Sequence, residues 1–253
     1  MKETLYTIPL TDAFNEQDEC PFCFIRRKLE QDALDFILGS GSAYMESDVR
    51  KQTNQSGFCA DHYKLMFKYG NSLGNAIMIQ SYLRETKKEL EKQMNHYSTE
   101  KVSLVDKLTK NTSVCRSSLY RFTQQTTKDC FVCNKINDTF DRYIDTFFFL
   151  YQSKEDFRTL FKQSKGFCLS HFGLLTEAAE EKLGKKQKEE FYAVLFPQME
   201  ENLQRLDEDI SWFIEKFDYQ NKDADWKDSR DALQRTMQKM TTGYPADDFY
   251  RSK

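Results

Sequence analysis

Six cysteines and two histidines occur in this chain as one pattern written twice. In each copy a Cys-x-x-Cys pair is followed further along the chain by a Cys-x-x-His pair. The first copy consists of Cys20, Cys23, Cys59 and His62, and the second of Cys130, Cys133, Cys168 and His171. Thiolates and imidazoles are the ligands that zinc prefers, and the two-residue spacings let both members of a pair reach one ion. The sequence therefore predicts two metal sites.

We assign one ion to each copy, so that each site has four ligands of Cys3His type. Four protein ligands leave no open position for a water molecule, and the predicted role of the zinc is therefore structural rather than catalytic. Three alternatives stay open. The residues could be small side chains of a duplicated core, or Cys-x-x-Cys could be a redox pair. Iron–sulfur ligation is the rival metal assignment, although fully cysteine-ligated sets are commoner.

The duplication extends beyond these ligands. Gly57-Phe58-Cys59 matches Gly166-Phe167-Cys168, and Leu73-Gly74 matches Leu183-Gly184. We interpret residues 1–98 as the first zinc-binding helical repeat, 99–217 as the second, and 218–253 as a C-terminal arm. No linker rich in Gly, Ser or Pro separates the repeats, which predicts a single helical body held together by one Cys3His site in each half.

Each repeat is expected to contain the same helices. The first follows the Cys-x-x-Cys pair, near 24–38 and 134–152, and a short one follows near 46–55 and 154–164. A long helix then begins at Cys-x-x-His, and Pro197 should kink or restart it in the second repeat. Residues 100–127 are predicted to form a joining helix, which would bury Cys115, the seventh cysteine.

The C-terminal arm has a helical apolar periodicity. Its apolar side chains, which would share one helix face, are Trp226, Leu233, Met237 and Met240. This pattern predicts that the arm packs on the helical body through that face.

Composition narrows the fold class and the partners. The chain has 21 Phe and 13 Tyr but only 9 Gly and 4 Pro, which favours long helices over strands and turns and predicts an all-α protein. A net charge of −3 argues against a nucleic-acid partner. No apolar run approaches the length that spans a bilayer, and no secretory signal is evident. We therefore expect a cytoplasmic protein whose thiols bind metal rather than form disulfides.

Several segments together resemble a known family. They are Tyr6-Thr7-Ile8-Pro9, the two Cys-x-x-Cys pairs, the two Gly-Phe-Cys-x-x-His segments and the stretch from Asp225 to Ala232. This combination is similar to the bacterial domain-of-unknown-function family 6062 of anaerobic Gram-positive bacteria, and it covers essentially the whole chain. The resemblance implies a cytosolic protein but no activity. The label of transporter substrate-binding protein, often attached to this family, fits poorly because neither a signal peptide nor an α/β pattern is present.

No Ser-His-Asp arrangement, phosphate-binding glycine loop or His-Glu-x-x-His motif occurs. We therefore predict a non-catalytic zinc protein that binds a protein partner or itself as a scaffold. One alternative is a thiol-based redox or metal sensor. The other is a small-molecule-binding protein or enzyme that uses a cleft between the repeats.

Overall fold

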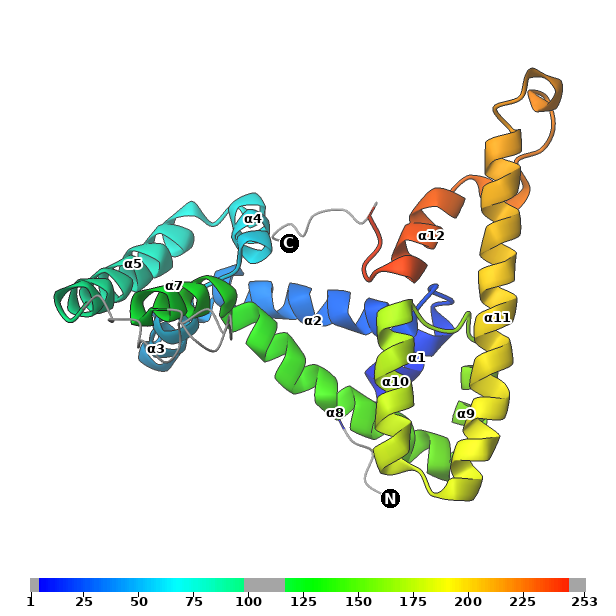
Figure 1. The fold of residues 1–253 in the computed structure, drawn as a ribbon, viewed down its shortest axis with the longest axis horizontal. Helices are drawn as coiled ribbons and strands as arrows, with labels where there is room; N and C mark the ends of the chain where they lie inside the picture. Colours follow the sequence, from blue (N-terminus) through cyan, green and yellow to red (C-terminus); the bar gives the residue numbers. More distant parts are fainter. Residues whose placement is uncertain (1–4, 98–116, 246–253) are drawn as a thin grey trace, which may run out of the picture. The chain divides into compact units, whose positions relative to one another are not determined.

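The computed structural model describes residues 5–97 and 117–245, and within these ranges the protein is entirely helical. Eleven α-helices and three short 3-10 helices account for the ordered elements of the described residues, which contain no strand (Figure 1). The predicted all-α class is confirmed. None of the described helices combines the length and the apolar character needed to cross a membrane.

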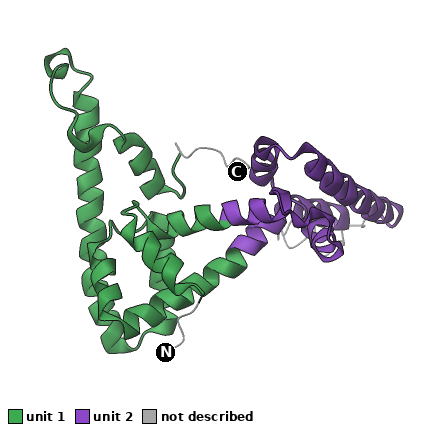
Figure 2. Cartoon of the chain, turned by 180° about the vertical axis from the view of Figure 1, so that it is seen from behind, with its two compact units in different colours: residues 1–29, 137–248 green, residues 30–136, 249–253 purple. Residues whose placement is uncertain are grey.

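The chain forms two compact units, coloured separately in Figure 2. The described part of unit 1 comprises residues 5–29 and 137–245, and that of unit 2 comprises 30–97 and 117–136. The chain passes from one unit to the other within two helices, α2 (Pro21–Leu38) and α8 (Phe131–Ser153). The repeat boundaries stay a prediction, because the units follow spatial contacts rather than internal similarity.

Unit 1 contains the beginning of α2 and most of α8. Its other elements are α1 (Thr7–Asn15), α9 (Glu155–Gln163), α10 (Leu169–Lys182), α11 (Lys185–Glu215), η2 (Tyr219–Asn221), η3 (Lys227–Ser229) and α12 (Ala232–Met240). Unit 2 contains the rest of α2 and residues 131–136 of α8. Its other elements are η1 (Ala43–Met45), α3 (Ser47–Ser56), α4 (Ala60–Tyr69), α5 (Ser72–Asn95) and α7 (Ser118–Lys128).

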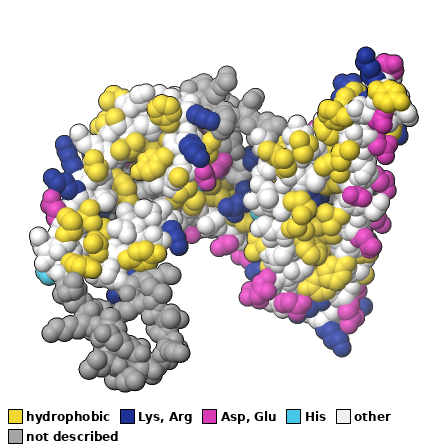
Figure 3. Space-filling view, turned by 45° about the horizontal axis from the view of Figure 1, so that its top comes forward, with side chains coloured by type: hydrophobic (Ala, Val, Ile, Leu, Met, Phe, Trp, Pro, Cys, Tyr) yellow, Lys and Arg dark blue, Asp and Glu magenta, His cyan; other side chains and the backbone are white. Residues whose placement is uncertain are grey.

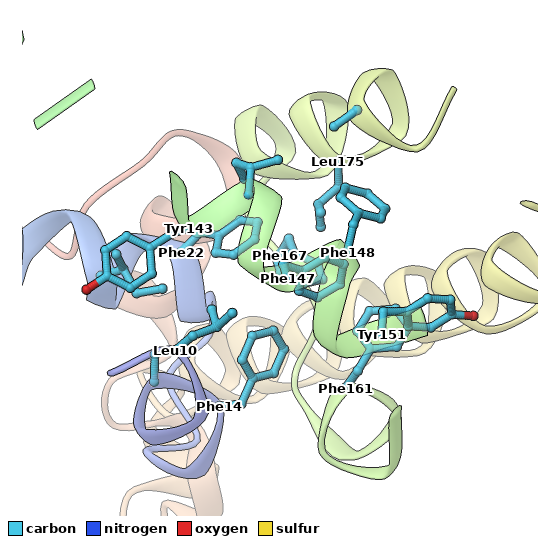
Figure 4. Close-up of a cluster of buried hydrophobic side chains, with 14 of the residues drawn as sticks. Leu10, Phe14, Phe22, Tyr143, Phe147, Phe148, Tyr151, Phe161, Phe167 and Leu175 are labelled. Atoms are coloured by element: carbon cyan, nitrogen blue, oxygen red, sulfur yellow. The ribbon is translucent and has the colours of Figure 1, made fainter. Parts of the chain in front are cut away.

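The core of unit 1 is built around Phe147, which is fully buried on α8. Its ring lies 5.9 Å from the ring of Phe14 on α1 and 5.7 Å from that of Phe22 on α2. It also lies 5.6 Å from the ring of Phe161 on α9 (Figure 4). The ring of Phe191 on α11 is 6.3 Å away. Edge-to-face and offset ring pairs at such distances stabilise a core beyond their buried area. The many phenylalanines thus join five helices into one unit.

The predicted helix beginnings agree with the structure more closely than the predicted lengths. Helices α2, α3, α8 and α9 match the four shorter predictions, but the long helix expected after each Cys-x-x-His is divided in two. In unit 2 the break follows Gly70, whose φ of 101° ends α4 in a left-handed conformation that favours glycine. In unit 1 the break lies at Leu183-Gly184, whereas α11 runs without interruption through Pro197. Of the predicted joining helix, α7 is observed; residues 100–116, including Cys115, lie outside the described residues.

The C-terminal arm packs on unit 1, but not through the face that its periodicity predicts. The buried residues of α12 are Ala232, Arg235, Gln238 and Lys239. Leu233, Met237 and Met240 are instead 41%, 46% and 54% exposed. The prediction of an apolar contact face was wrong because buried polar partners, described below, attract the opposite side of the helix.

Candidate metal centres

The eight predicted ligands come together as two groups of four. Cys20, Cys23, Cys168 and His171 form the unit 1 cluster, and Cys59, His62, Cys130 and Cys133 form the unit 2 cluster. Within each cluster the four ligand atoms lie within 4.8 Å of one another.

This grouping corrects the assignment made from the sequence. Each Cys-x-x-Cys pair meets the Cys-x-x-His pair of the other copy, not that of its own copy. Helix α2 explains why, because it begins at the first Cys-x-x-Cys pair and its 18 residues span about 27 Å. It carries the chain from unit 1 into unit 2 before Cys59 is reached, and α8 carries the chain back before Cys168.

The unit 1 cluster has the spacing of a tetrahedral ligand set. The Nδ1 atom of His171 lies 3.3 Å from Sγ of Cys20, 3.5 Å from Sγ of Cys23 and 3.2 Å from Sγ of Cys168. The Sγ atoms of Cys23 and Cys168 are 3.7 Å apart. Tetrahedral zinc at its usual bond lengths places sulfur and nitrogen ligands about 3.6 Å apart and two sulfurs about 3.8 Å apart. All four residues are buried.

The unit 2 cluster repeats this geometry with more exposure. The Nδ1 atom of His62 lies 3.1 Å from Sγ of Cys59, 3.3 Å from Sγ of Cys130 and 3.4 Å from Sγ of Cys133. The Sγ atoms of Cys59 and Cys133 are 3.9 Å apart. Disulfides have S–S distances near 2 Å, so these six cysteines are free thiols. Cys59 and Cys133 are only half-buried.

Helix beginnings position both members of each Cys-x-x-Cys pair. Cys20 directly precedes α2, and its N–H donates to Oδ1 of Asp18 at 2.9 Å. Cys130 precedes α8 in the same way, and its N–H donates to Oδ1 of Asp129 at 2.9 Å. The second cysteine of each pair, Cys23 or Cys133, lies in the first turn of the helix, so both thiols of the pair reach the same cluster.

A left-handed glycine positions each Cys-x-x-His pair. Gly57 and Gly166 have φ values of 61° and 72°, and each lies two residues before the cysteine at the N-cap of α4 or α10. A Cβ atom at Gly57 would lie 2.3 Å from the ring of Tyr82. The repeated Gly-Phe-Cys motif is thus a turn that only glycine accommodates without strain, and it directs the following helix start into the cluster.

The surroundings of the two histidines differ. Nε2 of His62 lies 3.0 Å from Oε1 of Glu30, which leaves Nδ1 directed at the thiols. A carboxylate on the outer nitrogen of a ligating histidine fixes the ring and raises its basicity. The ring of His171 instead lies 5.8 Å from that of Phe22 and 5.3 Å from that of Phe140. Aromatic packing therefore orients the histidine of unit 1, and a carboxylate orients that of unit 2.

Crowding sets the ionisation of the thiols. In unit 1, burial raises the pKa of Cys20 well above its ordinary value, whereas hydrogen bonds from Cys20 and Cys23 lower the pKa of Cys168 to about 3. In unit 2, burial raises the pKa of Cys133 to about 12. One thiol of a cluster is thus favoured as a thiolate while a neighbour stays protonated. A divalent cation suits such a donor set because it stabilises several thiolates at once.

The His62 imidazole and the Cys130 thiol are in hydrogen-bond contact, with Nδ1 and Sγ 3.3 Å apart. Burial by itself lowers the pKa of His62, but hydrogen bonds with Cys130 and Glu30 raise it to about 10. Burial by itself raises the pKa of Cys130, but the hydrogen bond with His62 and two backbone N–H groups lowers it to about 6. Each of the two groups thus favours the charged form of the other.

A buried ionic network next to Cys20 was not predicted. Glu19 is 3% exposed, and its carboxylate lies 2.5 Å from Arg205 on α11 and 3.5 Å from Arg235 on α12. The fully buried ammonium of Lys239 donates to the backbone oxygens of Glu19 at 2.7 Å and Lys165 at 2.6 Å. The only indication in the sequence was the acidic residue that precedes each Cys-x-x-Cys pair.

Fold and site together define an all-α protein with two Cys3His clusters of metal-binding type, each within one compact unit. The chain belongs to DUF6062, a family of unknown function, and residues 1–247 match the sequence model of that family. No curated protein matches the chain, and no solved structure does.

Proposed function

We propose that this protein binds two zinc ions in structural sites and has a non-catalytic binding or scaffold role in the cytoplasm. The observation that carries the metal assignment is the spacing of each cluster. Sulfur–nitrogen separations of 3.1–3.5 Å and sulfur–sulfur separations of 3.7 and 3.9 Å match the edges of one tetrahedron around a single ion.

The same spacing favours zinc over an iron–sulfur cluster. Ligands of a multi-iron cluster are distributed over different irons, which spreads them further apart than ligands of one ion. All ligand atoms of each cluster lie within 4.8 Å of one another, which supports a mononuclear site. Three cysteines and one histidine are a common zinc set, while iron–sulfur clusters are more often held by four cysteines.

A closed ligand set supports a structural role. Four protein ligands occupy the tetrahedron, so that no position is left for a reacting water. Metal binding then contributes to folding, by on the order of 10 kcal/mol for each site.

A groove on unit 1 supports the binding role. Leu169 and Phe172 on α10 and Met199 and Leu203 on α11 line a mainly apolar depression of about 500 Å³. Leu169 is 41% and Leu203 37% exposed, and Figure 3 shows hydrophobic side chains at the surface among charged ones. Contiguous exposed apolar side chains are typical of contact sites for a protein partner or a second copy.

The unit 2 cluster favours a thiol-based redox or metal sensor as the second candidate. Its Cys59 and Cys133 are half-buried, whereas the thiols of the unit 1 cluster are buried. Oxidation of zinc-bound thiolates depends on exposure, so peroxide would release the unit 2 ion first and leave the unit 1 ion bound.

Elemental analysis of protein purified without added metal tests the proposal. We expect two zinc ions per chain and little iron. Iron at stoichiometric amounts with a broad absorbance in the visible range would contradict the zinc assignment. Sedimentation measurements on the wild type and Leu203→Glu then test the groove, because a charge in its lining should abolish self-association or binding of a partner. The matched control is Ile214→Glu, which places the same charge at an exposed position of α11 outside the groove and should have no effect.

A further inference from the structure

We propose that unit 1 contains a binding site for a small dianion of phosphate type, at the junction of α11 and the C-terminal arm. The site is a pocket of about 520 Å³. It is distinct from the metal clusters and does not depend on the proposed zinc or scaffold role.

The pocket has a surplus of positive charge. Five cationic side chains and three carboxylates line it: Lys165, Arg205, Lys227, Arg230, Arg235, Asp209, Asp228 and Asp231. The surplus is therefore two charges, although the whole chain has a net charge of −3. Beneath the pocket, the Lys239 ammonium and the Glu19 carboxylate are 3.5 Å apart and neutralise each other. One bound dianion would balance the charges of the site.

The arginine side chains at the floor of the pocket are held in place by carboxylates before any ligand binds. The side chain of Arg235 is nine-tenths buried, and its guanidinium lies 2.9 Å from Asp209 and 2.8 Å from Asp231. Arg205 is held between Glu19 at 2.5 Å and Asp209 at 3.6 Å. Because these guanidinium groups are immobilised by their carboxylates, little side-chain entropy is lost when an anion approaches them.

The rim supplies the groups that would contact the ligand. Arg230 is exposed and lines the pocket, and no ion pair is observed for it among the described residues. The Lys227 ammonium lies 4.3 Å from the centre of the Trp212 ring, which restrains it at the rim. Lys165 is only loosely paired, with its ammonium 3.9 Å from Glu19. Arginine forks and lysine ammonium groups together are the usual ligands of phosphate oxygens.

Phosphate chemistry can come from a free phosphate ion or from a phosphate monoester. Isothermal titration calorimetry with inorganic phosphate, phenyl phosphate and succinate separates these cases on the full-length protein as purified. We expect one phosphate-type ligand per chain and much weaker binding of succinate. Tighter binding of phenyl phosphate than of phosphate would identify a monoester site, and the reverse order would identify a site for the free ion.

Charge-removing variants complete the test. Arg230→Gln and Lys227→Gln should each weaken phosphate binding about tenfold or more, because each removes a charge-assisted contact. The control Lys186→Gln removes the same charge from an exposed part of α11, where Lys186 lies 3.8 Å from Glu190, and should change binding less than about twofold.

Absence of saturable phosphate binding would overturn the proposal, as would equal weakening by all three variants or equal affinity for succinate. Zinc content is measured on the same samples. Phosphate binding without zinc would contradict only the proposed metal sites, and two zinc ions without phosphate binding would contradict only this inference.

Discussion

The exchange of ligands between the two copies can be tested by counting bound ions in double variants. If the structure is correct, Cys23 and Cys168 belong to one site, while Cys23 and Cys59 belong to different sites. The double variant Cys23→Ser/Cys168→Ser should therefore retain one ion per chain, and Cys23→Ser/Cys59→Ser should retain none. Assignment of one site to each copy predicts the opposite result for both variants.

The expected loss of folding stability follows from the number of metal sites that a variant damages. A structural zinc site contributes on the order of 10 kcal/mol at neutral pH, and removal of one of its four ligands should abolish stable binding in the presence of a chelator. A second change at the same site then costs little more, whereas a second change at the other site costs about as much as the first. The loss of stability should be strongly non-additive for the first pair and nearly additive for the second.

Native mass spectrometry and elemental analysis after dialysis against a chelator provide the count. Cys115→Ser is the matched control, because Cys115 has no counterpart in the duplicated pattern, and it should retain both ions. One ion in Cys23→Ser/Cys59→Ser together with none in Cys23→Ser/Cys168→Ser would refute the arrangement of the two clusters.

Three further predictions concern single residues. Glu30→Gln should weaken metal binding in unit 2 by about tenfold or more in a chelator competition, because the outer nitrogen of His62 loses its carboxylate; an unchanged affinity would contradict this role. Gly57→Ala should lower the free energy of unfolding by more than about 1 kcal/mol in urea titrations, whereas Gly41→Ala, where an added Cβ meets nothing within 4 Å, should have little effect. Burial and a hydrogen bond to the Asp35 carboxylate raise the pKa of Tyr69 to about 12. The contribution of this tyrosine to stability is therefore present below about pH 10 and is lost as the pH rises to 12. Tyr69→Phe should reduce the alkaline loss of stability in pH-dependent unfolding measurements, and an unaltered pH profile would show that the hydrogen bond contributes nothing.

The identities of the ligands could be predicted because they depend on local rules. Residue type and two-residue spacing select Cys20, Cys23 and their equivalents, and a helix start presents both members of a pair on one side. Which pairs share an ion depends on where α2 and α8 carry the chain. A duplicated sequence is equally compatible with both pairings, so that part of the site could not be predicted.

The orientation of α12 shows a second limit. Apolar periodicity predicted burial of Leu233, Met237 and Met240, yet the helix buries Arg235 and Lys239. Buried charges are favourable only when specific partners surround them, and these partners come from distant segments such as Glu19. Periodicity reports the apolar face of a helix but carries no information on such long-range ionic partners.

Because each cluster takes ligands from both copies of the pattern, the order in which the chain is synthesised affects which metal cluster can form first. All ligands of the unit 2 cluster lie between those of the unit 1 cluster along the chain, so the inner set is complete at Cys133 and the outer set only at His171. The loop that the outer set closes is roughly twice as long, which adds about 0.6 kcal/mol of closure entropy. The order of synthesis and the loop length thus both favour formation of the unit 2 cluster first. Cys20 and Cys23 can complete their site only after Cys168 and His171 have been synthesised.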